Sequence, residues 1–128
     1  MTPKQYEHGN TGYMTAQLGF ADQGVEKPLF TLPVGARVIS INATIQEAFN
    51  GDAANTLNIG DATDDDAYLS GVACGTPAGF NSTQQKTVSE TSRVIVGKVL
   101  GGGTTAATAG AAEVTVGYLL PTTKKVNY

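Results

Sequence analysis

The chain has 128 residues, which suits one domain with a single modest hydrophobic core. Its net charge is −3, only 15% of its residues are charged, and its lysines and arginines form no basic stripe, which speaks against nucleic-acid binding by phosphate neutralisation. A single cysteine, Cys74, excludes an internal disulfide and a cysteine-based zinc site, and we expect it to be a buried or half-buried structural thiol. No apolar run is long enough to span a membrane, and the polar N-terminus does not resemble a signal peptide.

The first segment of the chain, residues 1–12, predicts an extended polar arm, because the prolines and glycines within it oppose a helix. The next segment, residues 13–21, predicts a strand with four apolar side chains on one face: Met14, Ala16, Leu18 and Phe20. After a turn, residues 28–36 predict a short edge strand with Phe30 and Leu32 on one side, because prolines bracket these residues and limit their pairing.

Residues 36–50 (ARVISINATIQEAFN) give the strongest strand signal, because apolar and polar residues alternate with a period of two. The apolar face holds Ile39, Ile41, Ala43 and Ile45. The polar face holds Ser40, Asn42, Thr44 and Gln46. A helix would spread the isoleucines around its cylinder. The dipeptide Asn50-Gly51 then predicts a hairpin-type turn into a short strand with Leu57 and Ile59 facing inward.

Four aspartates crowd the segment that follows this strand: Asp61, Asp64, Asp65 and Asp66. The calcium loop of an EF-hand does not fit, because its sixth position, counted from Asp61, is aspartate rather than glycine, and its twelfth is Val72 rather than glutamate. An irregular calcium site between loops is one interpretation. We favour a solvated connection without metal, because aspartate stabilises turns and exposed charge discourages wrong pairing of edge strands.

The second half of the chain predicts two further strands after a long connection, residues 71–92. Three apolar residues would anchor this connection: Val72, Phe80 and Val88. The strands are residues 93–101 and 112–121, and a flexible loop rich in glycine, alanine and threonine, residues 101–111, joins them. The second strand alternates cleanly through Val114, Val116, Tyr118 and Leu120. Residues 122–128 end the chain as a polar tail.

Seven or eight short strands without an amphipathic helix predict an all-β chain, an antiparallel β-sandwich of the jelly-roll type. The sandwich domain would span residues 13–121, with the extended arm, residues 1–12, before it and the tail, residues 122–128, after it. The sequence has no repeating period, which excludes a solenoid.

No group of residues has the spacing of a catalytic centre, so we expect neither an enzyme nor a cofactor. The only histidine, His8, lies in the polar arm, far in sequence from any motif that carries a nucleophile. The serine elbow Gly-x-Ser-x-Gly and the zinc motif His-Glu-x-x-His are both absent. A weakly charged surface rich in small polar residues instead suits a protein that becomes covered by neighbours.

Three segments carry motifs that are familiar in combination. Residues 30–50 hold a proline-glycine turn and a long strand that ends in Ala-Phe-Asn, residues 55–71 hold Ile-Gly-Asp followed by Tyr-Leu, and residues 111–121 hold the last strand. Together they resemble small structural proteins of tailed-bacteriophage virions, in particular capsid decoration (cement) proteins with a jelly-roll fold. Related β modules occur in phage tails, baseplates and fibres, so a structural or adhesion module of that kind is the alternative.

The resemblance implies a protein that binds the outer surface of the assembled head and stabilises it by bridging major capsid protein subunits. Such proteins are usually dimers or trimers, and they reach the outside of the virion after synthesis in the bacterial host cytoplasm. Nucleic acid, membrane and small-molecule substrates are not expected partners.

Contacts with the capsid would fall on the two polar ends and on the loop of residues 101–110, because these parts are expected to be exposed and flexible. The tyrosines near the ends allow two interpretations, either core filling or aromatic anchors for a partner surface. The candidate contact residues are Tyr6, His8, Tyr13, Lys124, Lys125 and Tyr128.

Overall fold

The computed structural model describes residues 11–51, 54–82, 93–101 and 103–120. Over these residues the chain forms eight strands and one turn of 3-10 helix, η1 (Phe20–Asp22). The strands are β1 (Thr11–Gly19), β2 (Lys27–Leu32), β3 (Arg37–Glu47), β4 (Asn55–Asp61), β5 (Leu69–Ala73), β6 (Ala78–Ser82), β7 (Arg93–Gly101) and β8 (Ala111–Leu119). Within this part of the chain, no helix is long and apolar enough to cross a membrane.

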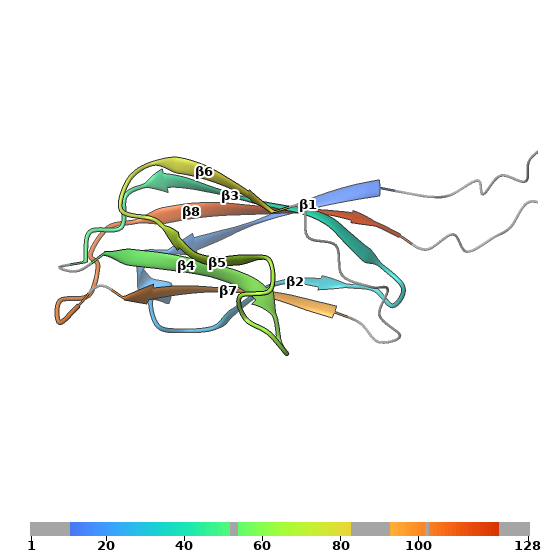
Figure 1. Cartoon of the computed structure of the whole chain (residues 1–128), viewed down its shortest axis with the longest axis horizontal. Helices are drawn as coiled ribbons and strands as arrows, with labels where there is room; N and C mark the ends of the chain where they lie inside the picture. The colour runs from blue at the N-terminus through green and yellow to red at the C-terminus, as the bar shows by residue number, and fades with distance from the viewer. Residues whose placement is uncertain (1–10, 52–53, 83–92, 102, 121–128) are drawn as a thin grey trace, which may run out of the picture.

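The strands form two four-stranded antiparallel sheets that lie face to face (Figure 1). The order is β1-β8-β3-β6 in one sheet and β2-β7-β4-β5 in the other. Every pair of consecutive strands except β4 and β5 is therefore divided between the two sheets. This is the strand order of a jelly roll, so the predicted fold class is confirmed.

The core lies between the two sheets and is built from alternate residues of the strands. Ile41, Ala43 and Ile45 of β3 are at most 1% exposed, as their alternation predicts, and Leu57 and Ile59 of β4 are fully buried as well. The other strands contribute Leu18, Phe30, Leu32, Ile95, Val99, Val114 and Val116. The sequence pattern therefore located most of the core correctly.

Two residues that were expected in the core lie at its margin. The register of β3 against β8 shifts between Val38 and Ser40, and this bulge leaves Ile39 half-buried while Val38 is fully buried. Phe20 is 43% exposed, because β1 ends at Gly19 and Phe20 begins η1. In both cases the sequence keeps its period of two past a point where the strand itself bends or ends.

Two connections also differ from the sequence-based expectation. Asn50-Gly51 does not form a hairpin, because β3 and β4 lie in opposite sheets. Residues 71–92 are not one long connection, since they contain most of β5 and all of β6. Val72 and Phe80 do pack against the core as expected, and Val88 lies outside the described residues.

Candidate interaction surface

Of the six candidate contact residues, Tyr13 lies within the described part of the chain. Its side chain is 68% exposed, the highest value among the exposed large apolar residues described. Thr11 at the start of β1 pairs with Leu119 at the end of β8, so the chain enters and leaves the sandwich at the same end. The other candidates lie outside the described residues: Tyr6, His8, Lys124, Lys125 and Tyr128.

The outward side of the sheet β1-β8-β3-β6, here called the polar face, carries mostly small uncharged side chains. Its central positions are Tyr13, Thr15, Gln17, Glu113, Thr115, Gly117, Ser40, Asn42 and Thr44. The hydroxyl oxygens of Thr15 and Thr115 lie 3.2 Å apart. The carboxylate of Glu113 accepts hydrogen bonds from the amides of Gln17, at 3.1 Å, and Gln46, at 3.5 Å. The one charge at these positions is therefore already solvated by neutral side chains, which suits a face that loses water on contact.

The ring of Tyr13 has a defined place on the polar face because Gly117 leaves room for it. Gly117 pairs with Tyr13 on one side and with Ser40 on the other. A methyl group at Gly117 would lie 3.0 Å from Cε1 of Tyr13 and 2.6 Å from Oγ of Ser40. The exposed ring thus rests against the sheet, and less side-chain freedom is lost when a partner covers it.

The loop between β7 and β8 is held by side chains from other connections, at least over residues 107–110. Oδ1 of Asn50 accepts hydrogen bonds from the backbone N–H groups of Thr108, at 2.8 Å, and Ala109, at 3.0 Å. The Asn50 amide also donates to the Thr108 hydroxyl, at 3.1 Å. Gln23 accepts a bond from the Ala107 N–H at 3.0 Å, and Glu47 accepts one from the Gly110 N–H at 2.9 Å. The sequence-based expectation of a flexible loop did not include these tethers.

Replacing Asn50 with alanine is expected to lower the free energy of unfolding by about 1–2 kcal/mol, because three hydrogen bonds to the loop are lost. Asn50→Asp keeps the two acceptor contacts and should cost roughly half as much. Urea unfolding of the three proteins measures both differences. Equal losses in the two variants would contradict the assignment of Oδ1 as the main tether.

The aspartate segment between β4 and β5 is organised by its own hydrogen bonds. Oδ1 of Asp61 accepts bonds from the N–H groups of Thr63, at 3.0 Å, and Asp64, at 2.9 Å, as in a turn stabilised by aspartate. The pKa of Asp66 is lowered, first by the side-chain hydrogen bond that it shares with Asp64 and then by the one that it accepts from the Ser70 hydroxyl at 2.9 Å. Oxygens of the carboxylates of Asp64, Asp65 and Asp66 lie within 4.8 Å of one another, a spacing that a cation could bridge. Because these hydrogen bonds account for the turn without a cation, we retain the interpretation of a solvated strand connection.

Cys74 is fully buried, as its small neighbours indicated. Burial raises the pKa of its thiol to about 11, so the reactive thiolate is scarce at neutral pH. Its backbone joins the end of β5 to the start of β4 and to the β3–β4 connection, because its N–H donates to Asn55 O at 3.2 Å and its carbonyl accepts from Phe49 N–H at 3.0 Å. The residue is structural.

No family model and no curated protein matches the sequence. Solved structures do match over nearly the whole chain. A chain in the acid-stable capsid of Helicobacter pylori bacteriophage KHP30 has a TM-score of 0.74 and 18% identity, and the match covers 98% of this chain and 100% of that one. A chain of the cyanophage Pam1 capsid has a TM-score of 0.68 and 26% identity, with 94% and 92% covered. A chain of the Ralstonia phage GP4 capsid has a TM-score of 0.70 and 20% identity, with 96% and 92% covered.

This chain shares its fold with chains of phage capsids. Each match covers at least 92% of this chain and at least 92% of the matched chain. The likeness therefore concerns the complete sandwich rather than a common submotif. They support the resemblance to phage virion structural proteins that the three sequence segments carried.

Proposed function

We propose that this protein is a capsid decoration protein that binds the outer surface of an assembled phage head and bridges major capsid protein subunits. The observation that carries the proposal is the match of the whole chain to chains in three phage capsids. The three neighbours described above each come from a capsid, which favours the head over the tail, baseplate or fibre. No chemical step is part of the function.

The surface of the sandwich is suited to such binding. The polar face offers neutral side chains and one exposed, supported aromatic ring, Tyr13. The entry and exit of the chain lie next to each other at one end, because Thr11 pairs with Leu119. Contacts made by the N-terminal arm and the C-terminal tail would therefore reach the shell from the same end of the molecule.

The protein stabilises the shell by mass action. A ligand that binds the assembled shell and not the free subunits shifts the equilibrium toward the shell, and the shift grows with occupancy. Weak contacts are sufficient if each molecule is a dimer or trimer that makes several of them at once. On this proposal the protein resides on the outside of the virion, after synthesis in the cytoplasm of the bacterial host.

Deletion of residues 1–10 is expected to reduce binding to heads without unfolding the domain, because β1 begins at Thr11. The measurement is co-sedimentation of the full chain and the truncated chain with heads of the encoding phage that lack this protein. A thermal melt of both proteins in solution is the control for folding. Undiminished binding of the truncated chain would exclude a role for the arm, and absence of the full chain from heads would exclude the proposed function.

A further inference from the structure

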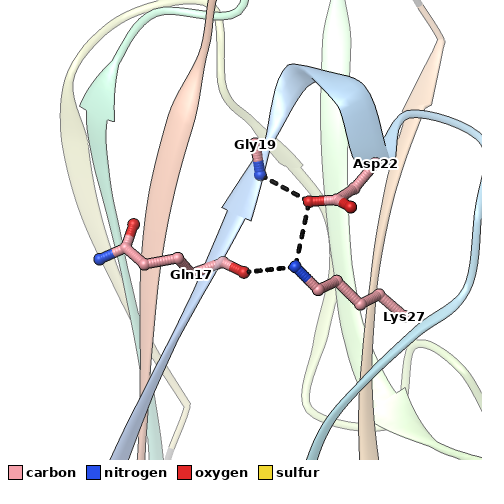
Figure 2. Close-up of polar contacts among 4 residues, drawn as sticks. All are labelled: Gln17, Gly19, Asp22 and Lys27. Carbon is pink, nitrogen blue, oxygen red and sulfur yellow. Dashed lines mark hydrogen bonds and ion pairs between the residues drawn. The ribbon is translucent and has the colours of Figure 1, made fainter.

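β1 is an edge strand, and its outward backbone groups can be assigned. The N–H of Phe20 donates to Gly110 O, which continues the ladder between β1 and β8 on even-numbered residues. The N–H of Gly19 and the C=O of Gln17 point away from β8 and bond elsewhere (Figure 2). Since N–H and C=O groups alternate in direction along an antiparallel strand, the odd-numbered residues of β1 present theirs to the free edge.

One end of this free edge is closed by an ion pair, as Figure 2 shows. Nζ of Lys27 lies 3.3 Å from Oδ2 of Asp22 and donates to the C=O of Gln17 at 3.1 Å. The same oxygen of Asp22 accepts the N–H of Gly19 at 2.8 Å. An additional strand cannot pair with Gln17 and Gly19 unless these bonds break.

The other end of the edge, residues 11–15, lacks such protection. No described residue pairs with the outer side of Thr11, Tyr13 and Thr15. The segment carries no charge and no proline, and its register with β8 is continuous, without a bulge. Charged residues, prolines and bulges are the features with which proteins normally protect exposed edges. The edge strand β2 of the opposite sheet has them, with a lysine, Pro28 and a shift in register.

We propose that this open half-edge, Thr11–Thr15, binds an extended, uncharged segment of the capsid shell protein, which adds to the sheet as a fifth strand beside β1. Main-chain hydrogen bonds to Thr11, Tyr13 and Thr15 would supply affinity, because the odd-numbered residues present their N–H and C=O groups to the free edge. The inference rests on the proposed function and names the surface through which it acts. The half-edge lies where the chain enters β1 and leaves β8, next to both polar ends.

The short length of the half-edge favours a shell segment over a second copy of this chain. A stable interface between two proteins buries about 1,200–2,000 Å² in total, more than the pairing of two five-residue strands provides. The Asp22–Lys27 pair prevents the pairing from extending along β1. A strand held in place by the rest of the shell needs less affinity from this contact, because the other contacts of a bound molecule contribute.

Proline at an edge position removes the outward N–H but no hydrogen bond to β8, so it tests the added strand directly. The experiment compares Tyr13→Pro with Tyr13→Ala, which loses the ring and keeps the N–H, in binding to heads of the encoding phage that lack this protein. The expected result is a Kd for Tyr13→Pro that is about fivefold weaker than for Tyr13→Ala, as the loss of one hydrogen bond implies. If thermal melts show that Tyr13→Pro does not fold, the pair Thr11→Pro and Thr11→Ala at the first residue of β1 replaces it.

The outcomes separate this inference from the proposed function. If the unmodified chain does not bind heads, both are excluded. If it binds and the proline and alanine variants bind equally, the added strand is excluded and the function stands. Concentration-dependent dimers in sedimentation that the proline variant abolishes would identify a second copy as the occupant, and this would overturn the assignment to the shell.

Discussion

Gly60→Ala is expected to lower the melting temperature by about 10 °C or more, because the added methyl group has no space on the outward side of β4. It would lie 2.7 Å from the carbonyl oxygen of Asp65 and would overlap the carbonyl group of Asp64. These backbone atoms are held in place, because Asp64 O accepts the N–H groups of Asp61 and Ala67 at 2.9 and 3.3 Å. Relief of the overlap therefore requires the aspartate segment to lift off β4, at a cost of about 3 kcal/mol.

The matched control is Gly79→Ala in β6. Gly79 is exposed and also lies in a strand, but a methyl group there meets no atom within 4 Å. Alanine should be neutral or slightly stabilising at this position, since glycine loses more backbone entropy on folding. Thermal melts followed by circular dichroism measure both variants. Similar melting temperatures for the two would show that the aspartate segment does not rest on β4.

Side-chain alternation predicted the core where strands are regular and failed where they bend. Ile41, Ala43 and Ile45 follow a period of two and are buried, because a sheet with one inward face turns every second side chain toward the core. Ile39 obeys the same period in sequence, but the bulge beside it interrupts the register. No residue in this segment signals a bulge, since it arises from the fit of β3 to β8.

The assignment of strands to sheets could not be predicted from local sequence. Asn50-Gly51 is a common hairpin turn, yet here it joins strands of opposite sheets, because β3 pairs with β6 and β8 instead of β4. β5 and β6 contain glycines and follow or precede proline and glycine, so their propensity for strand is weak. They form strands because neighbouring strands pair with them: β3 pairs with β6 along Ile41–Ile45, and β4 pairs with β5.

Of the candidate contact residues, the exposure of Tyr13 agrees with the sequence, while its contact role stays a prediction. Tyr13 was selected because tyrosines gather near the chain ends, and it is indeed exposed beside the point where both ends leave the sandwich. The tether of the β7–β8 loop by Asn50 joins residues 58 and 59 positions apart, which no local motif encodes. The closure of the β1 edge by Asp22 and Lys27 likewise depends on how the chain turns from one sheet to the other.

Stability is expected to fall steeply at alkaline pH, because two buried groups resist ionisation. Burial raises the pKa of Tyr68 to about 12 from its ordinary value of 10.0, and the positive charge of Arg93 offsets this only in part. Burial also raises the pKa of Cys74 to about 11 from 9.0. Each group holds its proton in the folded chain at a pH where the unfolded chain releases it.

The pH dependence follows from this difference in bound protons. The stabilisation linked to Tyr68 is fully present below pH 10 and is lost as the pH rises from about 10 to about 12, and that of Cys74 is lost between about 9 and 11. Shifts of this size correspond to about 2–3 kcal/mol for each group. Urea unfolding between pH 8 and pH 11.5 should therefore show a falling free energy of unfolding, to be measured for the unmodified chain and for Tyr68→Phe. Tyr68→Phe should flatten the fall above pH 10, whereas Tyr13→Phe, at a ring that is 68% exposed, controls for the loss of a hydroxyl group. An unchanged slope in Tyr68→Phe would mean that the buried phenol does not cause the alkaline loss of stability.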